Sequence, residues 1–440
     1  MQTTNRPTGM LGFSIVWLGQ IVSVLATGMT SFVLSIWVFQ KTGSATALAL
    51  VQVFFITPYI LITPFAGVMV DRHNRKLMMM VSDLAAGSAT VAILVLQALG
   101  GLEVWQLYAA AVVSGLGNAF QWPAYSATIT TMLPKEQYGR ANGMMSLVES
   151  GPQVVAPLLA GALLPLIGFT GILSIDVATF VFAIGALALV FIPQPKQSDE
   201  GAQARGNILQ EAAFGFRYIF ARPSLLGLQL TFFCGNFFGG IAYAVLTPMI
   251  LSRTHNDSVS LGLVMSAGAI GAVVGGVAMS AWGGFKRRVH GVLAGWAVSS
   301  LFSVFLGVGT TVPLWVAAIT LSGLLNPLIN GSNQAIWQSK VAPDVQGRVF
   351  SARTIIAWLT NPISPLIGGL LADYVLEPSL RDTGLGPFVP PGPGAGMALL
   401  IVIGNLAALL SGLSGYFVPA IRNAEDILPD HDQLPEVIVS

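Results

Sequence analysis

The sequence predicts an all-α, polytopic membrane protein with twelve transmembrane helices in two pseudo-symmetric halves of six. Three observations support this prediction: the composition, the spacing of the apolar stretches and an internal repeat. Of the 440 residues, 54% are hydrophobic and only 9% are charged. That leaves too little polar surface to cover a water-soluble globule, so we expect the chain to lie in a bilayer.

The apolar stretches give the helix count, because each crossing needs about 20 residues. We place helices at residues 10–39, 46–70, 77–100, 105–132, 138–164, 168–193, 224–252, 259–284, 289–310, 313–340, 346–377 and 395–421. The polar start, residues 1–8, leads into an apolar run that is longer than a signal-peptide core and has no small-residue cleavage pattern. The first helix is therefore expected to serve as its own insertion signal.

The basic residues orient these helices. Of the 20 Lys and Arg residues, all except Lys41, Arg253 and Arg381 fall on one side if both termini are cytoplasmic. This split follows the positive-inside rule, and an odd number of crossings would destroy it. We therefore expect a multi-pass integral protein of the plasma membrane, the inner membrane of the cell, with both termini in the cytoplasm.

Charge and proline content also divide the chain. We expect an N-terminal half at residues 1–193, a cytoplasmic linker at 194–222, a C-terminal half at 223–421 and an acidic, solvated tail at 422–440. The outer loop at 387–396 is rich in Pro and Gly, which indicates irregular structure.

An internal repeat relates the two halves. A shift of 208 residues matches Ser114-Gly115-Leu116-x-Asn118 to Ser322-Gly323-Leu324-x-Asn326, and Gly139-Arg140 to Gly347-Arg348. The matched segments lie in the fourth and fifth predicted helices, which belong to the first half, and in the tenth and eleventh, which belong to the second half. Repeats in this parallel relation typically enclose a central cavity that opens alternately to either face.

A charged turn joins the second and third helices. It contains Gly67, Asp71, Arg72, Arg75 and Lys76. Glycine allows close helix approach, the acid can accept from a helix N-terminus or an arginine, and the basic groups can meet anionic headgroups. We predict a gating latch and add Arg140 and Arg348 to it; the alternative is a simple topology anchor. The corresponding turn at 283–288 has basic residues without an acid, so we expect an asymmetric latch.

Twelve helices, the division into six and six and this turn resemble the major facilitator superfamily of transporters over nearly the whole chain. The segments Thr42-Gly43-Ser44-Ala45, Ser82-Asp83 and Gly139-Arg140-Ala141-Asn142-Gly143 resemble its drug:proton antiporters, which include macrolide efflux proteins and enterobactin exporters. The sequence departs from that subfamily at Ala86, where an arginine is expected. The antiporter motif of the fifth helix is reduced to Gly151-Pro152.

Two acids are predicted to couple transport to protons. Glu149 lies nine residues after Arg140, about 14 Å into the membrane, where a carboxylate is costly unless it is protonated or paired. A structural pair with Arg353 is the alternative. Asp83 is a second candidate for coupling, but its place near the cytoplasmic end of the third helix favours a part in the charges of the turn. We expect Asp176 and Asp373 to lie nearer the outer interface, within reach of water, as structural or gating residues.

Amides and aromatic residues at matching depth predict a substrate-binding cavity. They are Gln20, Asn118, Gln121, Trp122 and Tyr125 in the first half, and Asn236, Asn326, Asn330, Asn333, Gln334 and Trp358 in the second. Such groups either line a cavity or hydrogen-bond neighbouring helices. The mixture suits an amphipathic or weakly cationic organic molecule.

The preferred function is a proton-coupled exporter of small amphipathic compounds, drug-like or siderophore-like, that works by alternating access. A lysophospholipid flippase or an uncoupled facilitator of the same fold is the alternative. An enzyme is not expected, because His73, His255, His290 and His431 share no catalytic or metal-ligand spacing and Cys234 is the only cysteine. We expect no cofactor, metal or nucleic-acid partner. The expected partners are a small-molecule substrate, protons and membrane lipids, and the expected state is a monomer.

Overall fold

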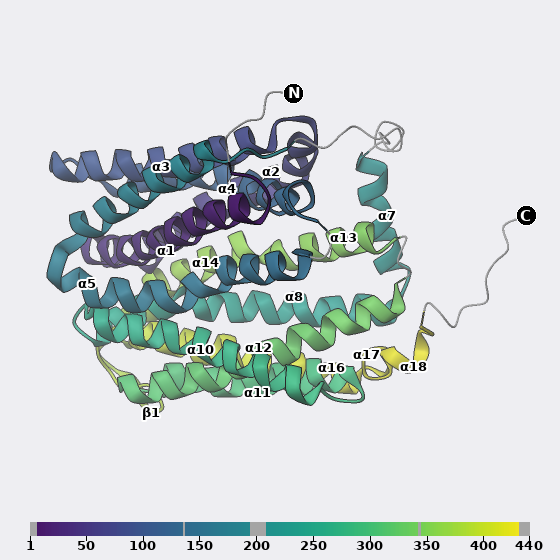
Figure 1. The fold of residues 1–440 in the computed structure, drawn as a ribbon. Helices are drawn as coiled ribbons and strands as arrows, with labels where there is room; N and C mark the ends of the chain where they lie inside the picture. Colours follow the sequence, from purple (N-terminus) through teal and green to yellow (C-terminus); the bar gives the residue numbers. More distant parts are fainter. Residues whose placement is uncertain (1–6, 135–136, 194–207, 342–344, 431–440) are drawn as a thin grey trace, which may run out of the picture. The chain divides into compact units, whose positions relative to one another are not determined.

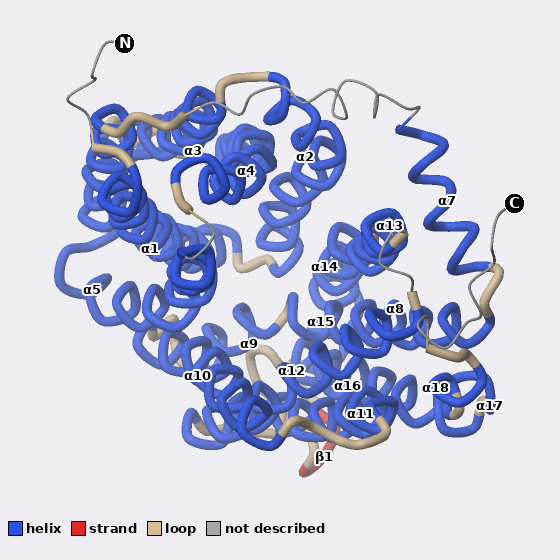
Figure 2. The backbone as a smooth tube through the Cα atoms, turned by 45° about the vertical axis from the view of Figure 1, so that its right-hand side comes forward, coloured by secondary structure: helices blue, strands red, loops and turns tan. Residues whose placement is uncertain are grey.

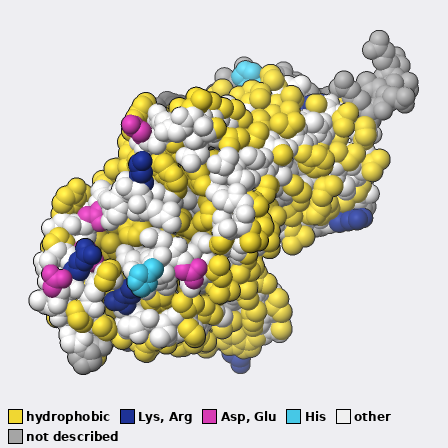
Figure 3. All heavy atoms as spheres, turned by 90° about the vertical axis from the view of Figure 1, so that its left-hand side faces the viewer, with side chains coloured by type: hydrophobic (Ala, Val, Ile, Leu, Met, Phe, Trp, Pro, Cys, Tyr) yellow, Lys and Arg dark blue, Asp and Glu magenta, His cyan; other side chains and the backbone are white. Residues whose placement is uncertain are grey.

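The computed structural model describes residues 7–134, 137–193, 208–341 and 345–430, and helices make up nearly all of this part (Figure 1). The only strand in these ranges is β1 (Gly384–Pro387), a short segment drawn in red in Figure 2. Large apolar side chains are exposed, among them Leu166 at 78% and Phe417 at 85%. Hydrophobic groups predominate on the face shown in Figure 3, and most of its few charged groups gather towards the left of the view. This surface suits lipid and confirms the predicted class.

Ten described stretches are long and apolar enough to cross a bilayer. One of them, Gly143–Leu189, has 47 residues, which is enough for two crossings. The helix α4 (Val104–Met132), which has 29 residues, is not among the ten. Counting the long stretch twice and adding α4 accommodates the twelve crossings that the sequence predicts.

The described chain divides into two compact units. Unit 1 consists of residues 1–196 with 250–266, and unit 2 consists of residues 197–249 with 267–440. The division crosses α9 (Leu246–Arg253) and α10 (Ser258–Trp282): residues 250–253 and 258–266 of these helices belong to unit 1, and their remaining residues belong to unit 2.

Unit 1 is a bundle of long helices. It contains α1 (Gly9–Thr42), α2 (Ala45–Arg72), α3 (Arg75–Ala98), α4 and α5 (Tyr138–Leu189). The helix α1 packs chiefly on α5, while α4 packs on both α2 and α3. Glycines permit some of these contacts: a Cβ at Gly115 of α4 would overlap the backbone carbonyl of Phe55 in α2. Such small-residue contacts are typical of helices packed in lipid.

The helix α5 has two arms, residues 138–167 and 169–189, separated at Gly168. Gly168 has φ 68° and ψ 179°, a conformation that favours glycine because it has no Cβ. The two helices predicted at 138–164 and 168–193 therefore exist, but a single residue separates them. Figure 1 shows the reversal of the chain at the label α5.

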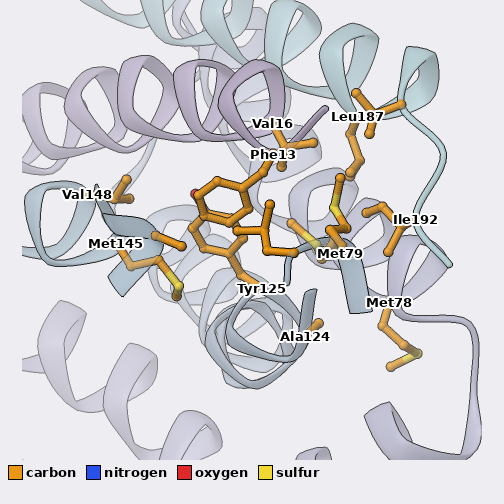
Figure 4. Close-up of a cluster of buried hydrophobic side chains, with 14 of the residues drawn as sticks. Phe13, Val16, Met78, Met79, Ala124, Tyr125, Met145, Val148, Leu187 and Ile192 are labelled. Atoms are coloured by element: carbon orange, nitrogen blue, oxygen red, sulfur yellow. The ribbon is translucent and has the colours of Figure 1, made fainter. Parts of the chain in front are cut away.

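The hydrophobic core of unit 1 lies where α1, α3, α4 and both arms of α5 meet. Figure 4 shows Phe13 and Tyr125 at its centre with Met79, Met145 and Leu187 around them. The rings of Phe13 and Tyr125 are stacked with centroids 6.1 Å apart.

Unit 2 contains the remaining long helices. They are α7 (Ile208–Phe220), α8 (Pro223–Ala244), α9 (Leu246–Arg253), α11 (Arg288–Val308), α12 (Val312–Lys340), α13 (Gln346–Trp358), α14 (Thr360–Leu371) and α16 (Ala395–Phe417). Short elements accompany them: the π-helix η2 (Ala372–Leu376), α15 (Glu377–Leu380), α17 (Pro419–Arg422) and α18 (Ala424–Ile427). The helix α11 packs on α12 and α16, and α8 packs on α14 and α16.

Two predicted crossings in this unit are present but locally interrupted. The one predicted at 224–252 corresponds to the stretch Pro223–Arg253 with a break at Val245, and the one predicted at 346–377 corresponds to Val349–Leu380, which is divided into α13, α14, η2 and α15. The predicted linker at 194–222 includes α7, while residues 194–207 lie outside the described ranges. In the outer loop, both carboxylate oxygens of Glu377 accept from backbone N–H groups, those of Gly394 and Gly396 at 2.6 and 2.9 Å.

The prediction of a solvated tail is also wrong as far as residue 430. Lys340, at the end of α12, pairs with Asp430 at 2.8 Å and donates to the carbonyl of Glu425 at 2.7 Å. The carboxylate of Glu425 accepts from the backbone N–H of Val289 in the first turn of α11. The tail therefore packs on unit 2, because its acids satisfy a buried ammonium group and a helix N-terminus.

Candidate functional site

A half-buried carboxylate joins three helices of unit 1. Asp83 of α3 accepts a hydrogen bond from Gln20 of α1 at 3.0 Å and another from Gln121 of α4 at 2.9 Å. Gln121 also donates to the side-chain oxygen of Gln20 at 2.7 Å. In this acid–amide triad, Asp83 was predicted as a coupling residue, whereas Gln20 and Gln121 were predicted to line the substrate cavity; the structure instead places both amides on the carboxylate. The expectation that Asp83 could join the charges of the turn is wrong, because its partners are these two amides.

The amides leave the negative charge of the triad uncompensated. The ion pairs among the described side chains are Arg287–Asp426 and Lys340–Asp430, and both lie in unit 2. A carboxylate inside a membrane protein is costly unless a proton or a cation neutralises it. The triad is therefore suited to bind and release a proton while its geometry is kept by neutral groups.

Glu149 has a different environment. It lies in the first arm of α5, and its side chain is exposed on unit 1. Gln153 donates to its backbone carbonyl rather than to its carboxylate. The two predicted coupling residues thus differ: the carboxylate of Asp83 is hydrogen-bonded to two side chains, whereas the side chain of Glu149 is exposed.

The charged turn is described only in part. The side chains of Gly67, Asp71, Arg72 and Arg348 lie outside the described residues. Arg75 is buried, Arg140 is exposed, and Lys76 donates to the carbonyls of Ala188 and Val190 at 2.8 and 2.7 Å. Lys76 therefore caps the C-terminal end of α5 instead of meeting lipid headgroups, which corrects its expected role. The gating latch stays a prediction.

In the turn at 283–288, the structure supplies an acid that the local sequence lacks. Asp426 of the tail pairs with Arg287, and the Glu425 carboxylate accepts from Val289 in the next helix. Arg287 of this turn therefore finds its acidic partner 139 positions along the chain.

Unit 2 contains a cavity of about 400 Å³, a size that falls within the usual range of small-molecule sites. Every residue that lines it is apolar, glycine or neutral and polar. Asn236, Asn326 and Asn330 were predicted and do line it. Asn330 donates to the carbonyl of Asn326 at 3.0 Å, which leaves its side-chain oxygen available. The amides of Asn236 and Asn326 make no hydrogen bond to other described residues and can serve a ligand.

The other predicted binding residues of unit 2 lie elsewhere. Asn333 is 2% exposed and accepts from Trp337, four residues along the same helix, at 3.0 Å. Gln334 accepts from the guanidinium of Arg353 at 2.9 Å. Trp358 is 37% exposed and does not line the cavity.

In unit 1, the remaining predicted residues do not share one environment. Asn118 is exposed, and so is Trp122 at 42%. Tyr125 is 2% exposed in the hydrophobic core, where its ring stacks on Phe13. The expected common face of α4 is therefore divided between the acid–amide triad, the core and the surface of the unit.

Sequence reasoning missed several groups around the unit 2 cavity. Asn361 and Asn405 add two amides, and Trp296 adds an aromatic ring. Ser299 and Ser303 both hydrogen-bond to Ser322, at 2.9 and 2.8 Å, which forms a short chain of hydroxyls at the wall. Asn405 could have been noticed, because it is the single amide in the apolar helix α16. The serines carry no comparable signal, since membrane helices often contain them as packing residues.

Comparison with known proteins agrees with this architecture. The sequence profile of the Major Facilitator Superfamily matches residues 16–365. Macrolide efflux protein A of Streptococcus pyogenes is 27% identical over 377 residues, which cover 83% of this chain and 90% of that protein. The enterobactin exporter EntS of Citrobacter koseri is 22% identical and covers 90% of this chain and 92% of its own.

Among solved structures, a bacterial homolog of the human lysosomal transporter Spinster, in an inward-facing and unoccupied conformation, has the same fold. Its TM-score is 0.67 at 15% identity, over 94% of this chain and 96% of that one. The profile match spans well over half of the sequence. The chain therefore belongs to the major facilitator superfamily and is a multi-pass membrane transporter of small molecules rather than an enzyme.

Proposed function

We propose that the protein is a proton-coupled exporter of small amphipathic organic compounds and that it works by alternating access. The observation that carries this proposal is the acid–amide triad of Asp83, Gln20 and Gln121. Its carboxylate is held by neutral donors from two other helices. Proton binding removes the charge and changes the hydrogen bonding among α1, α3 and α4, so it can alter the packing of these helices.

The relatives support export of organic molecules, since they are named as macrolide and enterobactin exporters. In this proposal, the cavity of unit 2 takes the polar part of the exported compound through its neutral amides and hydroxyls. Glu149, exposed on unit 1, is a second proton-accepting group. The proposal includes cytoplasmic termini, a monomer, and a gating role for the charged turn.

The test is transport into proteoliposomes with a radiolabelled macrolide as the probe. A pH gradient should drive accumulation by the wild-type protein, whereas Asp83→Asn should abolish accumulation and leave exchange of labelled for unlabelled probe. Glu149→Gln should reduce accumulation in the same assay. Asp257→Asn is the matched control, because Asp257 lies in a loop and caps α10.

Full accumulation by the Asp83→Asn and Glu149→Gln variants would remove both acids from the coupling mechanism. If Asp83→Asn loses both exchange and accumulation, Asp83 is needed for the fold or for binding rather than for coupling.

A further inference from the structure

A second carboxylate is buried where α1, α3 and α5 of unit 1 meet. Asp176, in the second arm of α5, is 2% exposed. One of its oxygens accepts from the hydroxyl of Thr27 at 3.0 Å, and the other accepts from the hydroxyl of Thr90 at 3.1 Å. The expectation that water reaches Asp176 is therefore wrong. Nothing in the proposed transport mechanism uses this group.

A third hydroxyl beside this carboxylate makes no hydrogen bond of ordinary geometry. Thr30 is 4% exposed, and its Oγ1 faces Asp176 without reaching that geometry in the described part of the chain. Thr27 and Thr30 are three positions apart on α1, so they share one face of the helix. A buried hydroxyl without a partner is costly, and each such group in a native structure needs an explanation.

The surroundings offer no positive side chain to Asp176. The other charged residues of the helices packed here are Lys41 on α1, Arg75, Lys76 and Asp83 on α3, and Arg140 and Glu149 on α5; α4 has none. Asp83 is seven positions from Thr90, about 10 Å along α3. The two described ion pairs lie in unit 2 and do not include Asp176.

The oxygen atoms at this site are the kind of ligand that a hard cation prefers. Two carboxylate oxygens and three hydroxyl oxygens converge from three helices, without the sulfur or imidazole groups that soft or borderline metals prefer. One carboxylate supplies a single negative charge, which balances a monovalent ion. We propose that Asp176, Thr27, Thr30 and Thr90 form a binding site for a dehydrated Na⁺ ion inside unit 1.

A proton would use this site only in part. It would occupy one oxygen of Asp176, and the resulting O–H could donate to a single hydroxyl. Each hydroxyl has two lone pairs, so all three threonines can rotate their hydrogens away and turn an oxygen towards a cation. A Na⁺ ion can therefore use the carboxylate and the three hydroxyls together.

The helices are held close together beside the site. A Cβ at Gly87 of α3 would overlap the ring of Phe180, one turn from Asp176 on α5, and a Cβ at Gly19 of α1 would lie 3.1 Å from the Cβ of Ala186. Such contacts fix the separation of α1, α3 and α5, so the oxygens are held in place before an ion binds. A bound ion would then stabilise the junction of three helices. This inference is independent of the proton coupling proposed for Asp83.

The test measures the melting temperature of the detergent-purified protein in NaCl, KCl and choline chloride at equal ionic strength and constant pH. We expect Na⁺ to raise the melting temperature saturably, by about 2–4 °C, because it binds only the folded state. Thr30→Val should remove this shift. It should change the melting temperature without Na⁺ only slightly, since the Thr30 hydroxyl makes no hydrogen bond of ordinary geometry there and valine has a similar shape.

Asp176→Asn should also remove the shift, and Thr30→Val alone decides the question if that variant does not fold. Thr231→Val is the matched control, because Thr231 is a buried threonine of α8 that donates to its own helix at Gly227. The control should keep the Na⁺ shift. The proposal is overturned if NaCl and choline chloride give the same melting temperature, if Thr30→Val keeps the shift, or if stability changes with pH but not with Na⁺.

Discussion

The two units solve the problem of polar groups in a membrane differently. Unit 1 contains the half-buried Asp83 and the buried Asp176, and it surrounds each carboxylate with neutral donors from other helices. Unit 2 has a cavity whose lining carries amides, hydroxyls and aromatic rings without a carboxylate or an ammonium group. The groups that can take up an ion are thus separated along the chain from the groups best suited to bind a neutral part of an organic molecule.

The degree of hydrogen bonding differs in the same way. In unit 1, the carboxylate of Asp83 has both oxygens engaged, whereas in unit 2 the amides of Asn236 and Asn326 make no hydrogen bond within the described chain. A satisfied network holds helices in fixed positions, while unsatisfied amides at a cavity wall are ready for a ligand. The comparison predicts that changes in unit 1 affect coupling and stability, and changes at the cavity affect affinity.

The largest effect on ligand affinity should come from filling the cavity of unit 2. Gly239 lines it, and a Cβ there meets nothing within 4 Å, so Gly239→Leu places its side chain in open space. We expect macrolide affinity to fall at least about tenfold, equivalent to about 1.4 kcal/mol, with the melting temperature little changed. Isothermal titration calorimetry of the purified protein measures the affinity.

Gly235→Leu provides the contrast on the same helix, because a Cβ at Gly235 would overlap the ring of Trp296. This variant should lose stability. Unchanged affinity in a well-folded Gly239→Leu protein would show that the ligand does not use the cavity.

The next effect concerns the acid–amide triad of unit 1. Gln121→Leu removes the donor to one oxygen of Asp83 and to Gln20, which leaves buried polar atoms without partners. We expect a loss of about 1–3 kcal/mol in the free energy of unfolding. Chemical denaturation in detergent, compared with Gln121→Glu and with the double variant Gln121→Leu/Asp83→Leu, measures it.

The double variant should recover part of the loss, since both polar partners are then gone. A loss in the double variant equal to the sum of the losses in Gln121→Leu and Asp83→Leu would mean that Gln121 and Asp83 do not interact.

A smaller effect is expected where the tail meets unit 2. Lys340→Met removes a buried ammonium group from Asp430 and from two backbone carbonyls of the tail, so limited proteolysis should release the tail faster, by a few-fold. The hydrogen bond from Lys340 lowers the pKa of Asp430 below its ordinary value of 3.8. The stabilisation by the Lys340–Asp430 pair is present at neutral pH. It is lost as the pH falls below about 4 and passes through the lowered pKa of Asp430.

Proteolysis at pH 7 and at pH 3.5 with an acid-active protease checks whether the tail is released faster at low pH. Equal cleavage rates of wild type and Lys340→Met at pH 7 would show that the pair does not hold the tail.

The smallest effect should come from the exposed ion pair of the tail. The side chains of Arg287 and Asp426 are 53% and 56% exposed, and surface pairs contribute little. Asp426→Asn should change stability by less than about 1 kcal/mol, and the change should vanish in 0.5 M salt. A loss as large as that of Lys340→Met would contradict the distinction between the buried and exposed pairs.

The sequence predicted the fold class because composition and hydropathy report directly on the bilayer. It also singled out Gln20, Asp83 and Gln121, although it could not show that they bind one another, because these contacts join residues 38 to 101 positions apart. Spacing on α4 suggested that Tyr125 shares a cavity with Asn118, but packing placed the ring in the core. Periodicity describes one helix and cannot say which neighbour covers each face.

Other features carried no local signal. The folding of Glu425 and Asp430 onto unit 2 depends on the distant Lys340 and on the exposed N-terminus of α11, so the tail looked simply acidic and solvated. The site at Asp176 consists of threonines scattered over α1 and α3, a residue type that is common in membrane helices.

The central claim, that an acid of unit 1 supplies coupling while the cavity of unit 2 supplies recognition, is tested most directly by proton release on ligand binding. The measurement adds a macrolide to purified protein in weakly buffered detergent with a pH-sensitive dye, and calorimetry records binding in parallel. The account predicts that wild type releases protons, that Asp83→Asn binds with similar affinity but releases none, and that Gly239→Leu loses both binding and release. Undiminished proton release by a ligand-binding Asp83→Asn protein would contradict it.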